Sequence, residues 1–151
     1  MKGKAVVLLM QLLIVAGMGL LLLFIVNPGI PIGWLVNPGH RKVAQEWLTE
    51  ASNGRFEEAS HAIGHPRKEE WIRGMQRLKE EGFYPIGFER LKVPHDRELG
   101  DGRVHIDFME NGSKKTYYAI LTFGGGSVGQ VCIFSPQTER TEAWNKLNCH
   151  Y

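Results

Sequence analysis

An uncharged apolar run near the N-terminus constrains this chain more than any other feature. Residues 5–26 contain no charged side chain, and Gln11 is their one strongly polar residue. A helix of this length, at about 1.5 Å per residue, can cross a hydrocarbon layer of roughly 30 Å. A chain of 151 residues has no core large enough to cover such a helix on all sides. The run therefore predicts a transmembrane helix over 5–26.

The residues that flank this run indicate an uncleaved anchor and its orientation. A cleaved signal peptide has a shorter apolar core, of about 7–15 residues, and a small-x-small cleavage site. Residues 25–28 (Ile-Val-Asn-Pro) offer no such site. Lys2 and Lys4 make the short N-terminal tail basic, and basic flanks remain in the cytoplasm. We therefore expect a cytoplasmic tail at 1–4 and a single-pass protein of the cell membrane, with its C-terminal domain outside.

The segment after the run is rich in residues that interrupt helices. Residues 27–40 include three prolines and three glycines, which predicts a linker without regular helix. Trp34 lies in this segment. Indole rings are favourable at the headgroup layer, so Trp34 is expected to anchor the linker at the membrane interface.

Charge balance limits the partners of residues 41–151. This region has sixteen basic and sixteen acidic residues, so it lacks the positive charge typical of nucleic-acid-binding proteins. Apolar and aromatic residues occur throughout it, which makes intrinsic disorder a poor description. We expect a folded domain over 41–151 that does not bind nucleic acid.

The first part of this domain has the apolar spacing of helices. Three helices are predicted: the first ends at Asn53-Gly54, the second ends near Gly64, and the third begins at Pro66 and ends at Gly82. Their apolar positions are Val43, Ala44, Trp47, Leu48, Ala51, Phe56, Ala59, Ile63, Trp71, Ile72, Met75 and Leu78.

After Gly82 the pattern alternates, as in half-buried antiparallel strands. Strands are predicted at 86–93, with a bulge, around 103–108, around 117–123 and at 128–134. Asn111-Gly112 predicts a tight hairpin, because both positions of that turn need positive φ. Ser135-Pro136 is expected to cap a short last helix. The fold class is α+β: a transmembrane helix, three helices packed on a four-stranded antiparallel meander, and a short C-terminal helix.

Part of this pattern resembles a known superfamily. A first helix ends at Asn53-Gly54 and Arg55-Phe56-Glu57-Glu58-Ala59 follows it; a further helix and a meander come next. Over about residues 41–135 this is similar to the nuclear-transport-factor-two-like, or cystatin-like cone, superfamily, in its small bacterial membrane-anchored form. The resemblance implies helices on a curved sheet that together form a cone. Enzymes of this type use a carboxylate or histidine inside the cone as a general base, and bitopic members act as scaffolds in conjugation and secretion machines.

Candidate catalytic residues gather on one strand face. Arg103, His105 and Asp107 alternate along one predicted strand, and side chains of that parity share a face. Tyr118 should lie beside His105 or Asp107 across the hairpin. The three residues His105, Asp107 and Tyr118 are weak candidates for proton transfer, because a polar face opposite Val104, Ile106 and Phe108 is more simply a solvated one.

Metal and cofactor signals are weaker. His61 and His65 have the spacing of two ligands on a helix, but Gly64 and Pro66 should end the helix before both rings align. Residues 124–126 are all glycine, without the helix and Lys-Ser/Thr of a phosphate loop. We expect no metal site and no cofactor.

Two cysteines allow two interpretations. Cys132 and Cys149 could form a disulfide between the fourth strand and the last helix, which an extracytoplasmic compartment would permit. In the alternative, Cys132 is buried as a small apolar residue and Cys149 is free. The spacing alone does not decide between them.

These observations lead to a functional hypothesis. The chain is expected to be a membrane-tethered extracytoplasmic binding or assembly module without catalytic activity. Its partners would be the lipid bilayer, through residues 5–26, and itself or another envelope protein. The alternative is a small-molecule-binding or isomerase-like enzyme that uses the cone-shaped pocket with His105, Asp107 and Tyr118.

Overall fold

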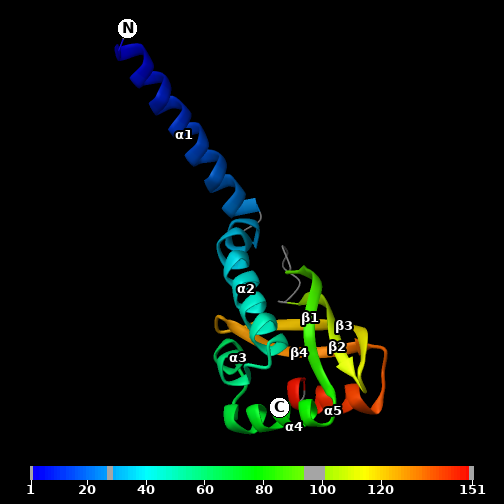
Figure 1. Cartoon of the computed structure of the whole chain (residues 1–151). Coiled ribbons are helices and arrows are strands. Elements are labelled where there is room, and N and C mark those ends of the chain that lie inside the picture. Colours follow the sequence, from blue (N-terminus) through cyan, green and yellow to red (C-terminus); the bar gives the residue numbers. More distant parts are fainter. Residues whose placement is uncertain (1, 27–28, 94–100, 150–151) are drawn as a thin grey trace.

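Five helices and one four-stranded sheet form the described part of the chain, residues 2–26, 29–93 and 101–149 of a computed structural model (Figure 1). The helices are α1 (Lys2–Val26), α2 (Gly29–Ser52), α3 (Phe56–Ala62), α4 (Lys68–Glu80) and α5 (Glu139–Asn148). The strands are β1 (Phe83–Lys92), β2 (Gly102–Glu110), β3 (Ser113–Gly124) and β4 (Ser127–Ser135). The α+β class and the order of its elements agree with the sequence prediction.

The first helix projects away from the rest of the molecule (Figure 1). Its large apolar side chains, where described, are between 56 % and 78 % exposed. Considered over the residues that the structure describes, no helix is both long enough and apolar enough to cross a membrane. The described residues therefore do not support the predicted transmembrane helix. Residues 5–26 lie within α1.

The linker prediction for 27–40 is wrong from Gly29 onward, because α2 begins there and continues to Ser52. Pro31 falls in the first turn of α2, where backbone N–H groups have no helical partner and proline is tolerated. Pro38 occupies an interior position, but the buried stripe from Ala44 to Ala51 follows it and anchors the helix. Residues 27–28 and the side chain of Trp34 lie outside the described part, and so does the predicted interfacial contact of Trp34.

The three predicted helices of the domain are present as α2, α3 and α4. Gly54, with φ +71°, ends the turn after α2, and Gly82, with φ +77°, follows α4. The start predicted for the third helix is wrong by two residues, because α4 begins at Lys68. The reason is local: the Arg67 N–H donates to His65 Nδ1 over 3.1 Å, which holds Pro66 in a bend before the helix.

The strands form an antiparallel meander in the order β1-β2-β3-β4. Asn111 and Gly112 both have positive φ, +50° and +79°, as the predicted hairpin requires. β1 begins at Phe83, three residues before the predicted start. Register shifts between Pro85 and Gly87 and between Glu89 and Lys92 show why its alternation is irregular in the sequence.

Aromatic side chains fill the space between the helices and the sheet. The largest of them are fully buried: Trp47, Trp71, Trp144, Phe83, Phe108 and Tyr117. The rings contact one another edge to face, stacked or tilted, at centroid distances from 4.5 Å for the stacked pair Phe83–Phe108 to 6.4 Å for the tilted pair Trp47–Trp71. At the described residues the interior of the predicted cone is thus a packed core.

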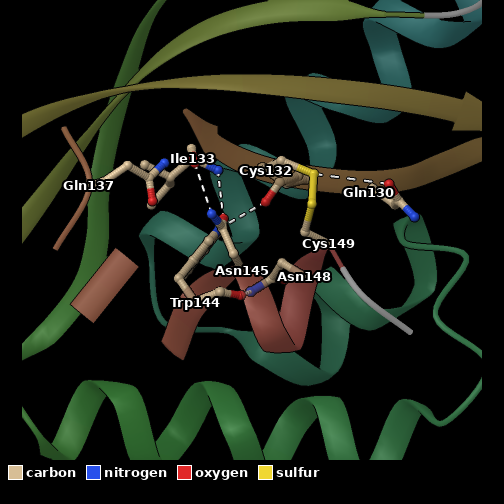
Figure 2. Close-up of a disulfide and its surroundings, with 9 residues drawn as sticks. Gln130, Cys132, Ile133, Gln137, Trp144, Asn145, Asn148 and Cys149 are labelled. Atoms are coloured by element: carbon tan, nitrogen blue, oxygen red, sulfur yellow. Dashed lines mark hydrogen bonds between the residues drawn. A yellow bond between two sulfur atoms is a disulfide. The ribbon is translucent and has the colours of Figure 1, made fainter. Parts of the chain in front are cut away.

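The outer edge of β4 is covered by other parts of the chain. Ile63 forms a parallel bridge with Val128. Further along, the Asn145 amide on α5 accepts from Ile133 N–H and donates to Ile133 C=O, both over 2.8 Å (Figure 2). These contacts occupy backbone groups that an open edge would offer to other chains. The cap of α5 is Thr138, which bonds to Thr141, and not Ser135-Pro136 as predicted.

Candidate functional site

The polar residues predicted to share a face lie on the side of the sheet away from the core. Tyr118 on β3 is opposite His105 on β2, and their ring centroids are 5.6 Å apart. Asp107 is next along the same face of β2. All three side chains are half-buried, while Arg103 is exposed. The sheet therefore brings together the three residues that alternation and the hairpin predicted, but on its outer face and not on the face that packs against the helices.

Asp107 is held by two neighbours that occupy both of its oxygens. Lys114 Nζ lies 2.8 Å from Oδ2, and Thr116 donates its hydroxyl to Oδ1 over 2.6 Å. Burial alone would raise the pKa of Asp107, but the bonds from Lys114 and Thr116 outweigh it and leave that pKa lowered. A charged carboxylate with both oxygens engaged is a poor general base.

His105 is the least constrained member of the set. Its Nδ1 is buried and has no hydrogen-bond partner among the described residues. The ring contacts Tyr118, and Tyr118 in turn meets Phe134 edge to face at 6.4 Å. Phe134 is 65 % exposed. The outer face thus has a row of three rings across β2, β3 and β4, which is a contact surface more than a reaction pocket.

The two histidines with metal-ligand spacing do not converge. His61 is exposed on α3, whereas His65 lies beyond the end of that helix and is only 5 % exposed. His65 Nδ1 accepts the Arg67 N–H, and burial lowers the pKa of His65. Within residues 2–26, 29–93 and 101–149, no three His, Cys, Asp or Glu side chains are grouped to hold a metal ion.

A buried carboxylate that the sequence analysis missed lies at the end of β2. Glu110 is 6 % exposed; the Tyr117 hydroxyl donates to its Oε2 over 2.8 Å, and Lys115 Nζ lies 2.5 Å from the same atom. The missed signal was parity, since position 110 continues the inward series of 104, 106 and 108.

The charge states of this pair follow from its contacts. The bond from Lys115 lowers the pKa of Glu110 against the opposing effect of burial. Burial and the bond to Glu110 raise the pKa of Tyr117 to about 12. At neutral pH Glu110 is therefore charged and Tyr117 protonated, which describes a structural pair and not an acid and base exchanging a proton.

Cys132 and Cys149 form a disulfide, with their Cα atoms 5.1 Å apart (Figure 2). The bridge joins β4 to the residue that follows α5. Next to it, Asn148 is fully buried and accepts the Trp71 indole N–H over 2.8 Å. The end of α5 is thus connected covalently to the sheet and by a hydrogen bond to α4.

These features define the class of the domain: α+β, with helices on one face of a four-stranded antiparallel meander and a disulfide that joins its last helix to the sheet. Comparison with protein-family models, with curated proteins and with solved structures found no match.

Proposed function

We propose that this chain is a membrane-tethered extracytoplasmic binding or assembly module without catalytic activity, built on a nuclear-transport-factor-two-like cone. The observation that carries the proposal is the exposure of α1, whose described large apolar side chains are at least 56 % accessible. A long apolar surface of this kind is a site of interaction with a membrane or a protein partner. The bilayer is favoured because residues 5–26 carry no charge.

Two further features support the location outside the cytoplasm. Lys2 and Lys4 are the only charged residues before position 41, and a basic flank favours a cytoplasmic N-terminus. The Cys132–Cys149 disulfide is of a kind that persists in oxidising compartments. Both are consistent with a domain held outside the cell membrane by one helix.

Binding or assembly is favoured over catalysis by the packing of the domain. Six buried aromatic side chains occupy the space that a cone-shaped pocket would need. Asp107, one of the candidate bases, is engaged by Lys114 and Thr116. Outside α1, Phe134 is the one large apolar side chain that the described residues leave exposed. These features favour a module that binds proteins over an enzyme. Its partner would be a second copy of this chain or another envelope protein.

Membrane attachment is tested by fractionation. The full chain should remain in membranes washed with alkaline carbonate, and external protease should remove the C-terminal domain from spheroplasts. A matched variant, Leu13→Lys with Val15→Lys, places two charges in the apolar run, each costing about 2.5–3.5 kcal/mol at the centre of a spanning helix. This variant should move to the soluble fraction. Release of a mature form without residues 1–26 from the unaltered chain would contradict the proposal.

The absence of catalysis is tested at the outer face. The variants His105→Ala and Asp107→Ala should leave the phenotype of the chain intact, while crosslinking in membranes should trap the domain with itself or another envelope protein. The alternative, a small-molecule-binding or isomerase-like enzyme, predicts the reverse: loss of function in folded variants and no crosslinked partner. Circular dichroism of each variant separates loss of function from loss of fold.

A further inference from the structure

A cleft of about 350 Å³ lies between α4 and α5 and is lined mainly by cations. Arg67, Arg73 and Arg77 come from α4 and the residue that precedes it, and Lys146 comes from α5. Glu70 is the single carboxylate in the lining. We call this feature the α4–α5 cleft.

Two contacts hold the walls of the cleft close together, and a disulfide fixes the end of one wall to the sheet. Gly74 faces Leu147, and a Cβ on Gly74 would lie only 2.7 Å from Leu147 Cδ1, so the absence of a side chain there allows the two helices to approach. The Trp71–Asn148 hydrogen bond joins the same helices, and the disulfide holds the end of α5 to β4. The cations therefore extend from two helices that are fixed to each other, which lowers the entropy lost on binding.

Half of the cations in the cleft have no ion-pair partner among the described residues, and the other half are paired only at the surface. Arg67 pairs with Glu70 at 2.9 Å, and Arg73 approaches Glu69 only to 3.9 Å; such exposed pairs contribute little. Arg77 and Lys146 have no ion-pair partner among the described residues. At Arg77 and Lys146 an anion would gain favourable contacts without displacing an existing partner.

The length of the charged row indicates the shape of the ligand. Residues 67 to 77 extend over about 15 Å at 1.5 Å per helical residue. An extended peptide rises about 3.3 Å per residue, so four or five of its residues would follow the row. Several carboxylates on one strand match cations spread in this way better than one compact anion does.

The position of the cleft selects the source of the anion. α4 and α5 lie at the end of the domain far from α1 (Figure 1). With α1 in a bilayer, the cleft faces away from the headgroups of that membrane. We propose that the α4–α5 cleft binds an acidic, extended segment of a protein partner; the choice of a protein over lipid rests on the proposed function.

The test uses the full chain in a neutral detergent and fluorescein-labelled hexaglutamate as the probe. Fluorescence anisotropy should show salt-sensitive binding of hexaglutamate and none of hexaglutamine. The double variant Arg77→Glu, Lys146→Glu should weaken binding at least about tenfold, since it replaces two attractions by two repulsions. The control Arg103→Glu makes the charge change of either single substitution, but on the exposed outer face of β2, and should leave binding unchanged.

Other outcomes overturn the inference. The first is that the chain does not bind hexaglutamate, and the second is that Arg103→Glu weakens binding as much as the cleft variant does. The third is that the cleft variant still binds the peptide but no longer binds phosphatidylglycerol vesicles. The last result would assign the cleft to a lipid surface. Circular dichroism of the variants must match that of the unaltered chain. Fractionation tests the membrane proposal separately. If the chain stays in carbonate-washed membranes but does not bind the peptide, this inference alone is rejected. If the chain binds the peptide but does not stay in the membranes, the membrane proposal alone is rejected.

Discussion

Replacing Trp144 by alanine is expected to lower the free energy of unfolding by roughly 3–5 kcal/mol. The indole is fully buried, meets Phe108 edge to face at a centroid distance of 4.9 Å, and donates its N–H to Val131 C=O over 2.9 Å. Truncation leaves a cavity where α5 packs on the sheet and an unpaired carbonyl on β4. Urea unfolding of the full chain in detergent, followed by circular dichroism, measures the change.

Phe134→Ala provides the control for this prediction. Phe134 lies near the end of β4 and is 65 % exposed, so its truncation should change stability by no more than about 0.5 kcal/mol. Trp144→Phe retains an aromatic ring and loses the hydrogen bond, and should fall between the two. Equal effects of Trp144→Ala and Phe134→Ala would show that α5 does not pack on the core as described.

Removing the disulfide is expected to cost about 3 kcal/mol, because the bridge closes a loop of 17 residues in the unfolded chain. Cys132→Ser, Cys149→Ser and the double variant should lose nearly the same amount, since each change opens the same bridge. Thiol titration of the unfolded, unreduced chain should find no free thiol.

The competing interpretation of the cysteines gives a different pattern. If Cys132 were only a small apolar residue and Cys149 a free thiol, Cys132→Ser alone would be destabilising and Cys149→Ser neutral. Titration would then find two thiols before reduction. Either result would remove the covalent connection between α5 and β4, and with it part of the rigidity ascribed to the α4–α5 cleft.

Features that depend on neighbours in the chain were predicted well. The apolar stripe from Ala44 to Ala51 follows from helical spacing, and the meander follows from alternation around Val104, Ile106 and Phe108. The hairpin at Asn111-Gly112 follows from the positive φ that both residues adopt. The same alternation and hairpin brought His105 and Tyr118 together. Short-range backbone preferences and the burial of apolar side chains are sufficient for each of these results.

Errors arose where a distant contact overrides a local preference. Proline and glycine content predicted a linker without helix over 27–40, yet α2 begins at Gly29, with a buried stripe further along that packs on the domain. Glu110 was missed altogether, because nothing in its own strand shows that Tyr117 and Lys115 satisfy its charge inside the fold. A charged group can be buried when partners from another strand replace water.

The sequence by itself determined most of the helices, strands and turns after residue 40, and that an uncharged apolar run precedes an α+β domain. Only the tertiary structure decided that aromatic rings pack the space between helices and sheet, that Asn145 covers the edge of β4, that Cys132 meets Cys149, and that cations of α4 and α5 line one cleft. The reason is physical. Local periodicity encodes which face of an element is apolar, whereas distances between elements depend on how all of the side chains pack together.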